Sequence, residues 1–381
     1  MTNRRLALLA ALAVSAVVVA VLAASEIFLR VTVARPLRSP QPQVRYDPHP
    51  VRRFTLRPSQ EGFTFEAPFR VDAAGLRVNG PSMRAEARHS IVGLGDSFTF
   101  GMGVRDEETW PSRLEHYLDA AGESIVVRNA GTISYDAFHE LDLLRDLLGA
   151  RTITPPPSIV VHALYWNDYL THRPPERTDP SVLTPEGYFV WNEASQPPSR
   201  LRALANAAID RSMLAFVASR AVAWARDQLT GGTAAEGLYS RVERELEAGY
   251  VDTAGFASVR AVYHRMVALG DSAGFRTFVV IMPVLGVVAH KDATQQPYPQ
   301  FIRSMLTELE IPFLDVHELF ERGELGTADY LPFNRHVGAR GYDVIARSLA
   351  PRLILMLAQS AAADGRSARA RAGRGGAVPD R

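Results

Sequence analysis

Residues 91–97 read Ile91-Val92-Gly93-Leu94-Gly95-Asp96-Ser97, and this stretch decides the fold. Its apolar run predicts a buried strand that delivers the Ser97 hydroxyl to the carboxyl end of a sheet, where open α/β sheets place their chemistry. Gly95 allows the backbone to turn sharply beside the serine. The same tripeptide recurs at residues 270–272, but that copy follows a helical pattern and precedes a strand. We therefore predict that Ser272 lies in a helix-ending turn without a catalytic role.

Strands and helices alternate through the chain from residue 90 onward. Predicted strands cover residues 91–95, 125–129, 159–164, 277–282 and 312–316, and predicted helices cover residues 111–121, 138–148, 257–270, 298–309 and 339–357. This alternation favours an α/β fold with three layers, in which helices cover both faces of a parallel, doubly wound sheet. Right-handed crossovers then point all the strand ends the same way.

Polar and small residues follow three of these strands. The tripeptide Asn129-Ala130-Gly131 ends the second strand, and Tyr165-Trp166-Asn167-Asp168 follows the third. His336 lies near the C-terminus, five residues before Gly341 and a predicted helix. We expect Ser97, Gly131, Asn167 and His336 to meet at one edge of the sheet.

In these blocks the sequence resembles the SGNH (GDSL-like) hydrolase superfamily, including its membrane-anchored bacterial members, over roughly residues 88–355. The resemblance implies a flavodoxin-like sheet and a serine hydrolase without a cofactor or metal. It implies that Ser97 is the nucleophile and His336 the base, and that the Ser97 and Gly131 amides and the Asn167 side chain form the oxyanion hole. Asp96 and Asp168 would support the loops. Members often carry a glycine where this chain has Tyr165.

The acid that usually precedes the histidine of this superfamily is missing. Phe333 and Asn334 stand at the two positions where relatives carry aspartate, and Asp329 is the nearest acid upstream. Three interpretations remain open. Asn334 holds His336 through its carbonyl oxygen, or Asp329 reaches His336 from another direction, or the site binds acylated glycans without turnover. Replacing the acid of a serine protease by Asn costs about 10⁴ in rate, so a slow enzyme and an inactive one are both compatible with this sequence.

An apolar stretch over residues 6–25 follows Arg4 and Arg5. Its length matches one membrane span, and the basic residues predict a cytoplasmic N-terminus with the rest of the chain outside. We therefore expect residues 1–29 to anchor a single-pass protein of the cytoplasmic membrane, with membrane contact through residues 6–29. The alternative is a signal peptide cleaved after Val21-Leu22-Ala23, which would release a secreted protein.

The remaining segments differ in composition from the catalytic region. Residues 30–87 are rich in Pro and Arg and predict an extended arm, in which residues 69–77 alternate like a short strand and turn. The hydrolase-like domain then covers residues 88–358, interrupted by a helical insertion at about 170–255 that could form a lid, a partner surface or a membrane-apposed surface. Residues 359–381 predict a disordered basic tail.

Charge and composition narrow the function classes. A net charge of +1 gives no indication of nucleic-acid binding, and the absence of cysteine excludes disulfides and thiol catalysis. The histidines show no metal-like pairing. The leading hypothesis is an esterase or acyl hydrolase acting on an acylated small molecule, lipid or glycan. An O-acetyltransferase acting on polysaccharide and a non-catalytic glycan-binding or envelope-assembly protein are the alternatives.

Overall fold

The computed structural model describes most of the chain and a few isolated helical positions of the insertion. The described residues are 3–32, 44–65, 67–80, 87–168, 181–183, 187–191, 238–331 and 335–374, with 201, 204–205, 208, 212–215, 217–218, 221–222 and 225.

Five parallel strands form the central sheet. They are β5 (His89–Gly95), β6 (Ile125–Gly131), β7 (Pro157–Leu164), β10 (Arg276–Ile281) and β11 (Phe313–Asp315), in the spatial order β11-β10-β7-β5-β6. Numbered along the chain, this order is 2-1-3-4-5, the flavodoxin-like arrangement. The predicted fold class is therefore confirmed, and each strand lies within two residues of its predicted bounds.

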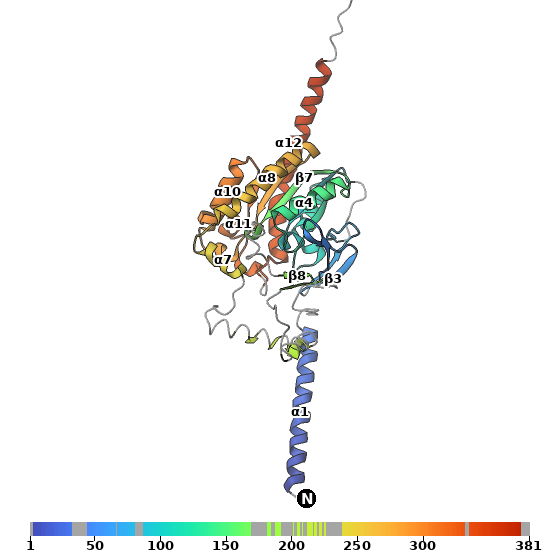
Figure 1. The fold of residues 1–381 in the computed structure, drawn as a ribbon, viewed down its shortest axis with the longest axis vertical. Helices are drawn as coiled ribbons and strands as arrows, with labels where there is room; N and C mark the ends of the chain where they lie inside the picture. Colours follow the sequence, from blue (N-terminus) through green and yellow to red (C-terminus); the bar gives the residue numbers. More distant parts are fainter. Residues whose placement is uncertain are drawn as a thin grey trace, which may run out of the picture.

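Helices pack in pairs against the sheet (Figure 1). Helix α3 (Trp110–Ala120) packs against α12 (Ala339–Arg374), and α4 (Ala137–Gly149) packs against α8 (Thr253–Ala273). Right-handed crossovers place these pairs on opposite faces, which gives the three layers. The shorter elements are α9 (Leu285–Val288), α10 (Pro297–Glu308), α11 (His317–Glu321) and the 3-10 turns Asp106–Glu108, Ala293–Gln295 and Thr327–Asp329.

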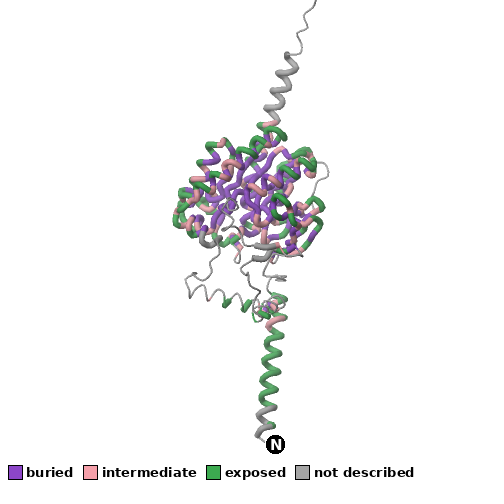
Figure 2. Tube along the Cα trace, viewed as in Figure 1, coloured by how far each residue is buried: buried purple, intermediate pink, exposed green. Residues whose placement is uncertain are grey.

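The core lies between these layers, and Figure 2 shows the interior of the domain as buried. Ile91, Val92, Val160 and Val161 are all fully buried, as parallel strands covered on both faces require. The start of α4 follows from its sequence, because the Asp136 carboxylate accepts hydrogen bonds from the first free amides of the helix.

The predicted extended arm is folded over its described part, residues 44–65 and 67–80. Strands β1 (Tyr46–His49) and β2 (Arg53–Leu56) form one antiparallel hairpin, and β3 (Gln60–Thr64) and β4 (Ala67–Val71) form another. The prediction of a tether was wrong here because apolar side chains on these short strands, including Phe54 and Phe69, are buried. The hairpins therefore belong to the folded domain.

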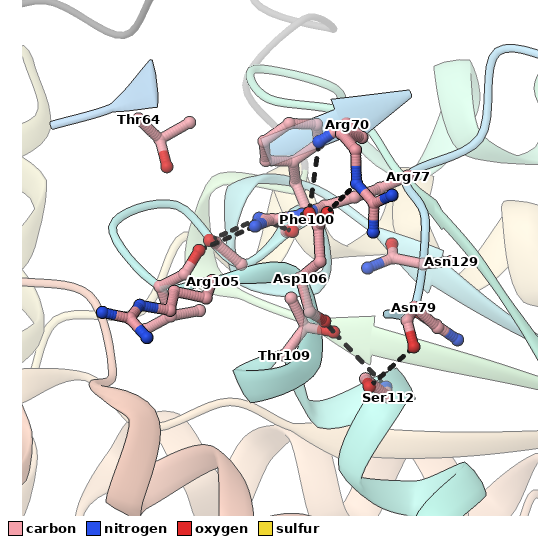
Figure 3. Close-up of polar contacts among 12 residues, drawn as sticks. Thr64, Arg70, Arg77, Asn79, Phe100, Arg105, Asp106, Thr109, Ser112 and Asn129 are labelled. Carbon is pink, nitrogen blue, oxygen red and sulfur yellow. Dashed lines mark hydrogen bonds and ion pairs between the residues drawn. The ribbon is translucent and has the colours of Figure 1, made fainter. Parts of the chain in front are cut away.

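Arg77 joins this arm to the α/β domain (Figure 3). Its guanidinium is fully buried and donates hydrogen bonds to the carbonyl oxygens of Phe100, Gly101 and Val104. It also donates to the Asp106 carboxylate at 3.2 Å. The Arg77 side chain thus holds the loop at residues 100–104 in place.

The described part of the insertion mixes strand and helix. Strands β8 (Ser181–Leu183) and β9 (Phe189–Trp191) form a hairpin where only irregular chain was expected, and Tyr188 makes a bridge with Arg45 of the arm. Helix α7 (Leu238–Glu247) precedes α8. The described positions between 201 and 225 are mainly helical, in the part of the insertion predicted to be helical.

Two helices extend beyond the domain. Helix α1 (Asn3–Thr32) contains one segment long and apolar enough to cross a membrane, Leu9–Thr32, with a mean hydropathy of 2.4 and none of it buried. A signal sequence would have the same composition. At the other end α12 continues to Arg374, whereas disorder was predicted from residue 359. The tail lacks an apolar face, but alanine and arginine favour helix without one.

Candidate active site

The catalytic turn connects β5 to the short helix α2 (Ser97–Phe100). Gly95 has φ 152°, and a Cβ atom there would lie 2.3 Å from the Thr99 hydroxyl, so only glycine fits. The Asp96 carboxylate accepts a hydrogen bond from the Phe98 amide at 2.9 Å and thereby caps the helix. Ser97 is consequently the first helical residue, at the carboxyl end of the central strand.

His336 contacts this serine directly. The distance between Ser97 Oγ and His336 Nε2 is 2.7 Å, although 239 residues separate them. The Phe98 ring stacks on the imidazole with a centroid distance of 4.7 Å. The centroid of the Tyr165 ring lies 4.3 Å from that of the Phe98 ring. The serine hydroxyl and the imidazole nitrogen are therefore within hydrogen-bond distance of each other.

Asn167 reaches the same turn from the end of β7. Its side-chain amide donates to Asp96 Oδ2 at 2.9 Å, and Ser97 Oγ lies 3.4 Å from that oxygen. Burial raises the pKa of Asp96 to about 6. Asp168 supports the neighbouring loop, because its carboxylate accepts from the Tyr165 amide at 2.8 Å.

Gly131 lies beside α2, at the end of β6. A Cβ atom at this position would lie 2.1 Å from the Phe100 nitrogen, so the close approach of the two backbones requires glycine. Its amide donates to the Asn129 side-chain oxygen at 3.0 Å. The N–H assigned to the oxyanion hole is thus already engaged in this structure.

The structure does not bring Asp329 to the histidine. Its carboxylate accepts from the Gly326 amide at 2.8 Å and forms an ion pair with Arg340. Both partners belong to the turn and helix around Asp329 itself, so among the described residues this carboxylate has no contact with the imidazole. Asn334, the other candidate, lies outside the described residues, as does Phe333.

The insertion contacts the histidine loop through Glu243 of α7. This carboxylate is buried, forms an ion pair with Arg335 and accepts a hydrogen bond from the Tyr165 hydroxyl at 3.1 Å. Arg335 itself adopts a left-handed backbone with φ 56°. Sequence reasoning missed Glu243, because α7 was not predicted and nothing in its pattern indicated a buried acid.

Comparison with known proteins places these features in a family. Residues 94–344, well over half of the chain, match the family model described as the GDSL-like Lipase/Acylhydrolase family. The chain belongs to this family. No curated protein matches it.

Several solved structures resemble this GDSL-like hydrolase at low identity. The psychrotrophic esterase EstA from Pseudoalteromonas sp. is 14% identical, with a TM-score of 0.37 over 71% of this chain and 99% of the esterase. A member of the lipolytic protein G-D-S-L family from Veillonella parvula is 13% identical, with a TM-score of 0.36 over 68% and 94%. The acetyl-xylooligosaccharide esterase Axe2 from Geobacillus is 12% identical, with a TM-score of 0.36 over 70% and 94%.

A buried polar cluster lies behind the serine of this GDSL-like hydrolase. Glu140 of α4 contacts His162 Nε2, and the other ring nitrogen of His162 is 2.8 Å from the Tyr263 hydroxyl. Burial raises the pKa of Glu140 well above its usual value and lowers the pKa of His162. Burial likewise raises the pKa of Asp168. A protonated Glu140 donating to a neutral His162 is the arrangement these directions favour.

The side chains of this cluster are of the kinds that bind metals. One ring nitrogen of His162 and one carboxylate oxygen each of Glu140 and Asp168 lie within 4.8 Å of one another. Both ring nitrogens of His162 are already engaged, by Glu140 and by Tyr263. The donor set therefore fits a proton-sharing network better than a metal site. The sequence placed His162 on the strand that became β7, but it did not show that Glu140 of a helix would be its partner.

Ser272 and the Asp315–His317 pair make local contacts of their own. Ser272 lies in the last turn of α8, is exposed, and donates to the Leu269 carbonyl at 2.8 Å, as expected for a helix-ending turn. The ring of His317 lies 2.7 Å from the Asp315 carboxylate, and both are buried at the end of β11. The two buried side chains therefore pair with each other at the end of β11.

Proposed function

We propose that this GDSL-like hydrolase is a serine esterase that uses Ser97 as its nucleophile and His336 as its base. The observation that carries the proposal is the 2.7 Å contact between Ser97 Oγ and His336 Nε2. A neutral imidazole at this distance can accept the serine proton as the oxygen attacks an acyl carbonyl.

The proposed reaction proceeds through an acyl-serine. Ser97 Oγ bonds to the acyl carbon, its proton moves to His336 Nε2, and the carbonyl oxygen becomes an oxyanion. The Ser97 amide and the Asn167 side-chain amide are the donors that would hold this oxyanion. His336 then protonates the departing alcohol, and water attacks the acyl-serine with His336 again as the base.

The proposed substrates are O-acyl esters of cell-envelope glycans or lipids. The support is the N-terminal segment Leu9–Thr32, which is apolar and has no buried part, with Arg5 on its N-terminal side. A membrane span of this orientation would place the Ser97 site outside the cytoplasm.

A fluorophosphonate probe on the purified full-length protein tests the nucleophile. The wild type should be labelled once, and Ser97→Ala should abolish labelling because the probe reacts only with an activated hydroxyl. Ser272→Ala is the matched control from the second Gly-Asp-Ser copy and should label like the wild type. Failure of the folded wild type to react would favour the glycan-binding alternative.

The missing acid has its own test. Asn334→Asp should raise kcat on p-nitrophenyl acetate, because a carboxylate two residues before His336 would stabilise the imidazolium and fix its productive tautomer. Asp329→Ala should change kcat little, since its carboxylate pairs with Arg340. Loss of activity in Asp329→Ala, with no gain in Asn334→Asp, would identify Asp329 as the acid after a rearrangement.

A further inference from the structure

Glu26 is an acid inside the apolar segment Leu9–Thr32 of α1. It pairs with Arg30 one turn later, at 2.6 Å. Its carboxylate also accepts from the Ser212 hydroxyl at 2.9 Å and from the amides of Met213 and Leu214 at 2.9 and 2.8 Å. These amides begin the helical residues 213–215 of the insertion. A residue of the candidate span therefore caps a helical segment located 186 residues away in sequence.

The depth of this contact along α1 matches a membrane interface. Glu26 lies six residues before Thr32, which corresponds to about 9 Å along a helix axis. Interfacial helices bury their apolar face about 5–10 Å into the boundary between headgroups and acyl chains. In Figure 1 part of the insertion trace lies against the domain-facing end of α1, in agreement with these hydrogen bonds.

The described helical positions around this contact expose apolar side chains. Leu201, Leu204 and Val222 expose 81%, 69% and 68% of their surfaces, respectively. The exposed positions 201, 204, 205 and 208 have the spacing of one helix face, as have 218, 221 and 222. Aliphatic side chains within the catalytic domain are instead mostly buried.

The sequence of this region adds a positive charge. Residues 200–226 contain five arginines and one aspartate, with no lysine or glutamate, which gives a net charge of +4. Apolar side chains combined with a basic composition are typical of segments that lie on anionic lipid.

We infer that the described helical positions between 201 and 225 lie on the membrane surface as a second lipid contact, docked to the anchor through Glu26. This inference rests on the proposed membrane placement of α1. The occupant of the exposed apolar face is the anionic bilayer itself, because α1 brings the segment to the depth at which headgroups lie.

Single-cysteine labelling of the full-length protein tests this inference, since the chain has no cysteine of its own. An environment-sensitive fluorophore is placed at Leu204→Cys or Val222→Cys, and the protein is reconstituted into phosphatidylglycerol–phosphatidylcholine vesicles containing brominated lipid. Val17→Cys in the middle of the span is the positive control. Leu355→Cys is the matched negative control, because Leu355 is 60% exposed on α12, and this helix leaves the domain at the end opposite α1 (Figure 1).

Labels at 204 and 222 should be quenched by bromines near the lipid carbonyls, whereas the label at 355 should not. Quenching at 204 and 222 no stronger than at 355 would overturn the inference. Labels at 204 and 222 that are shielded from acrylamide but not quenched by lipid would also overturn it, because they would indicate a protein partner. An unquenched label at 17 would overturn the anchor and this inference together, while the Ser97 labelling would still decide the esterase proposal.

Glu26→Ala tests the docking contact, with Ser25→Ala as its neighbour control. Loss of the cap should reduce quenching at 204 and 222 at least twofold and leave the signal at 17 unchanged. Equal quenching in the two variants would overturn the role assigned to Glu26.

Discussion

Asp96 links three parts of the catalytic turn with one carboxylate. One oxygen caps α2 through the Phe98 amide, and the other accepts from Asn167 and lies 3.4 Å from Ser97 Oγ. The side chain achieves this while fully buried, and burial raises the pKa of Asp96 from 3.8 to about 6. The folded protein therefore binds this proton more tightly than the unfolded chain does.

This shift predicts an unusual pH dependence of stability. Because the pKa is higher in the folded state, the contribution of Asp96 is largest below pH 4 and is lost as the pH rises toward 6. Relative to Asp96→Asn, the wild type should gain up to about 3 kcal/mol of unfolding free energy between pH 6.5 and 4. Urea denaturation at each pH measures this difference.

Asp271→Asn provides the control for Asp96, because Asp271 occupies the same place in the second Gly-Asp-Ser copy and is exposed. Its difference from the wild type should stay nearly constant over this pH range. A constant difference for Asp96→Asn as well would contradict the raised pKa.

At the residue scale, the sequence was informative where a residue with suitable chemistry lay at the end of a predicted strand. The order of blocks predicted that Ser97, Asn167 and His336 meet, and the structure brings Asn167 and His336 to the Ser97 turn, while their catalytic roles stay a prediction. Spacing could not show that Asp329 turns toward Arg340, because an ion pair across a turn leaves no sequence pattern. Nor could it show that the Gly131 amide is engaged by Asn129, which depends on a side-chain rotamer.

At the scale of elements, a buried polar contact connects α4, β7 and α8. Glu140, His162 and Tyr263 come one from each, and all three are fully buried. Glu140→Gln should change the unfolding free energy by less than about 1 kcal/mol, because an amide N–H can donate to His162 as the protonated acid does. Glu140→Ala should cost at least about 2 kcal/mol through the unpaired ring nitrogen and the cavity left behind.

Urea denaturation of the two Glu140 variants distinguishes a neutral Glu140–His162 pair from an ionised one. An ionised Glu140 paired with a charged His162 would make Glu140→Gln cost about 3–5 kcal/mol instead. That result would contradict the neutral pair.

The arm hairpins give a second prediction at this scale. Arg77→Met should reduce the unfolding free energy by about 3–5 kcal/mol, since it removes the buried one of the two arginines that pair with Asp106 and leaves three loop carbonyls without this donor. Arg70→Met is a matched control, because Arg70 pairs with the same Asp106 at 3.0 Å but is 54% exposed, and should cost about 1 kcal/mol or less. Equal losses in thermal or urea denaturation would contradict the role of Arg77.

Long strands and amphipathic helices could be predicted because their patterns repeat over several turns or residues. The arm hairpins could not, because each strand has only four or five residues and prolines lie both within and between the strands. Their stability comes from contacts with residues far along the chain, such as the loop after α2. The β8–β9 hairpin was missed for the same reason.

For the whole molecule, the proposed topology predicts which side of the membrane carries the site. A reporter enzyme that is active only outside the cytoplasm, fused after residue 358, should be active, and α1 should keep the chain in the membrane pellet after carbonate extraction. The same reporter fused to a chain lacking residues 1–32 is the control and should be inactive. A soluble mature chain beginning near Ser25 would instead identify a cleaved signal peptide.

The folded arm also limits where this hydrolase can work. Because the arm is packed on the domain from residue 44, only residues 33–43 connect it to α1, where the sequence had suggested a tether of more than fifty residues. Eleven residues span at most about 40 Å. In the proposed membrane placement, this short connection holds the enzyme close to the lipid surface, so esters deeper in the envelope must diffuse to it.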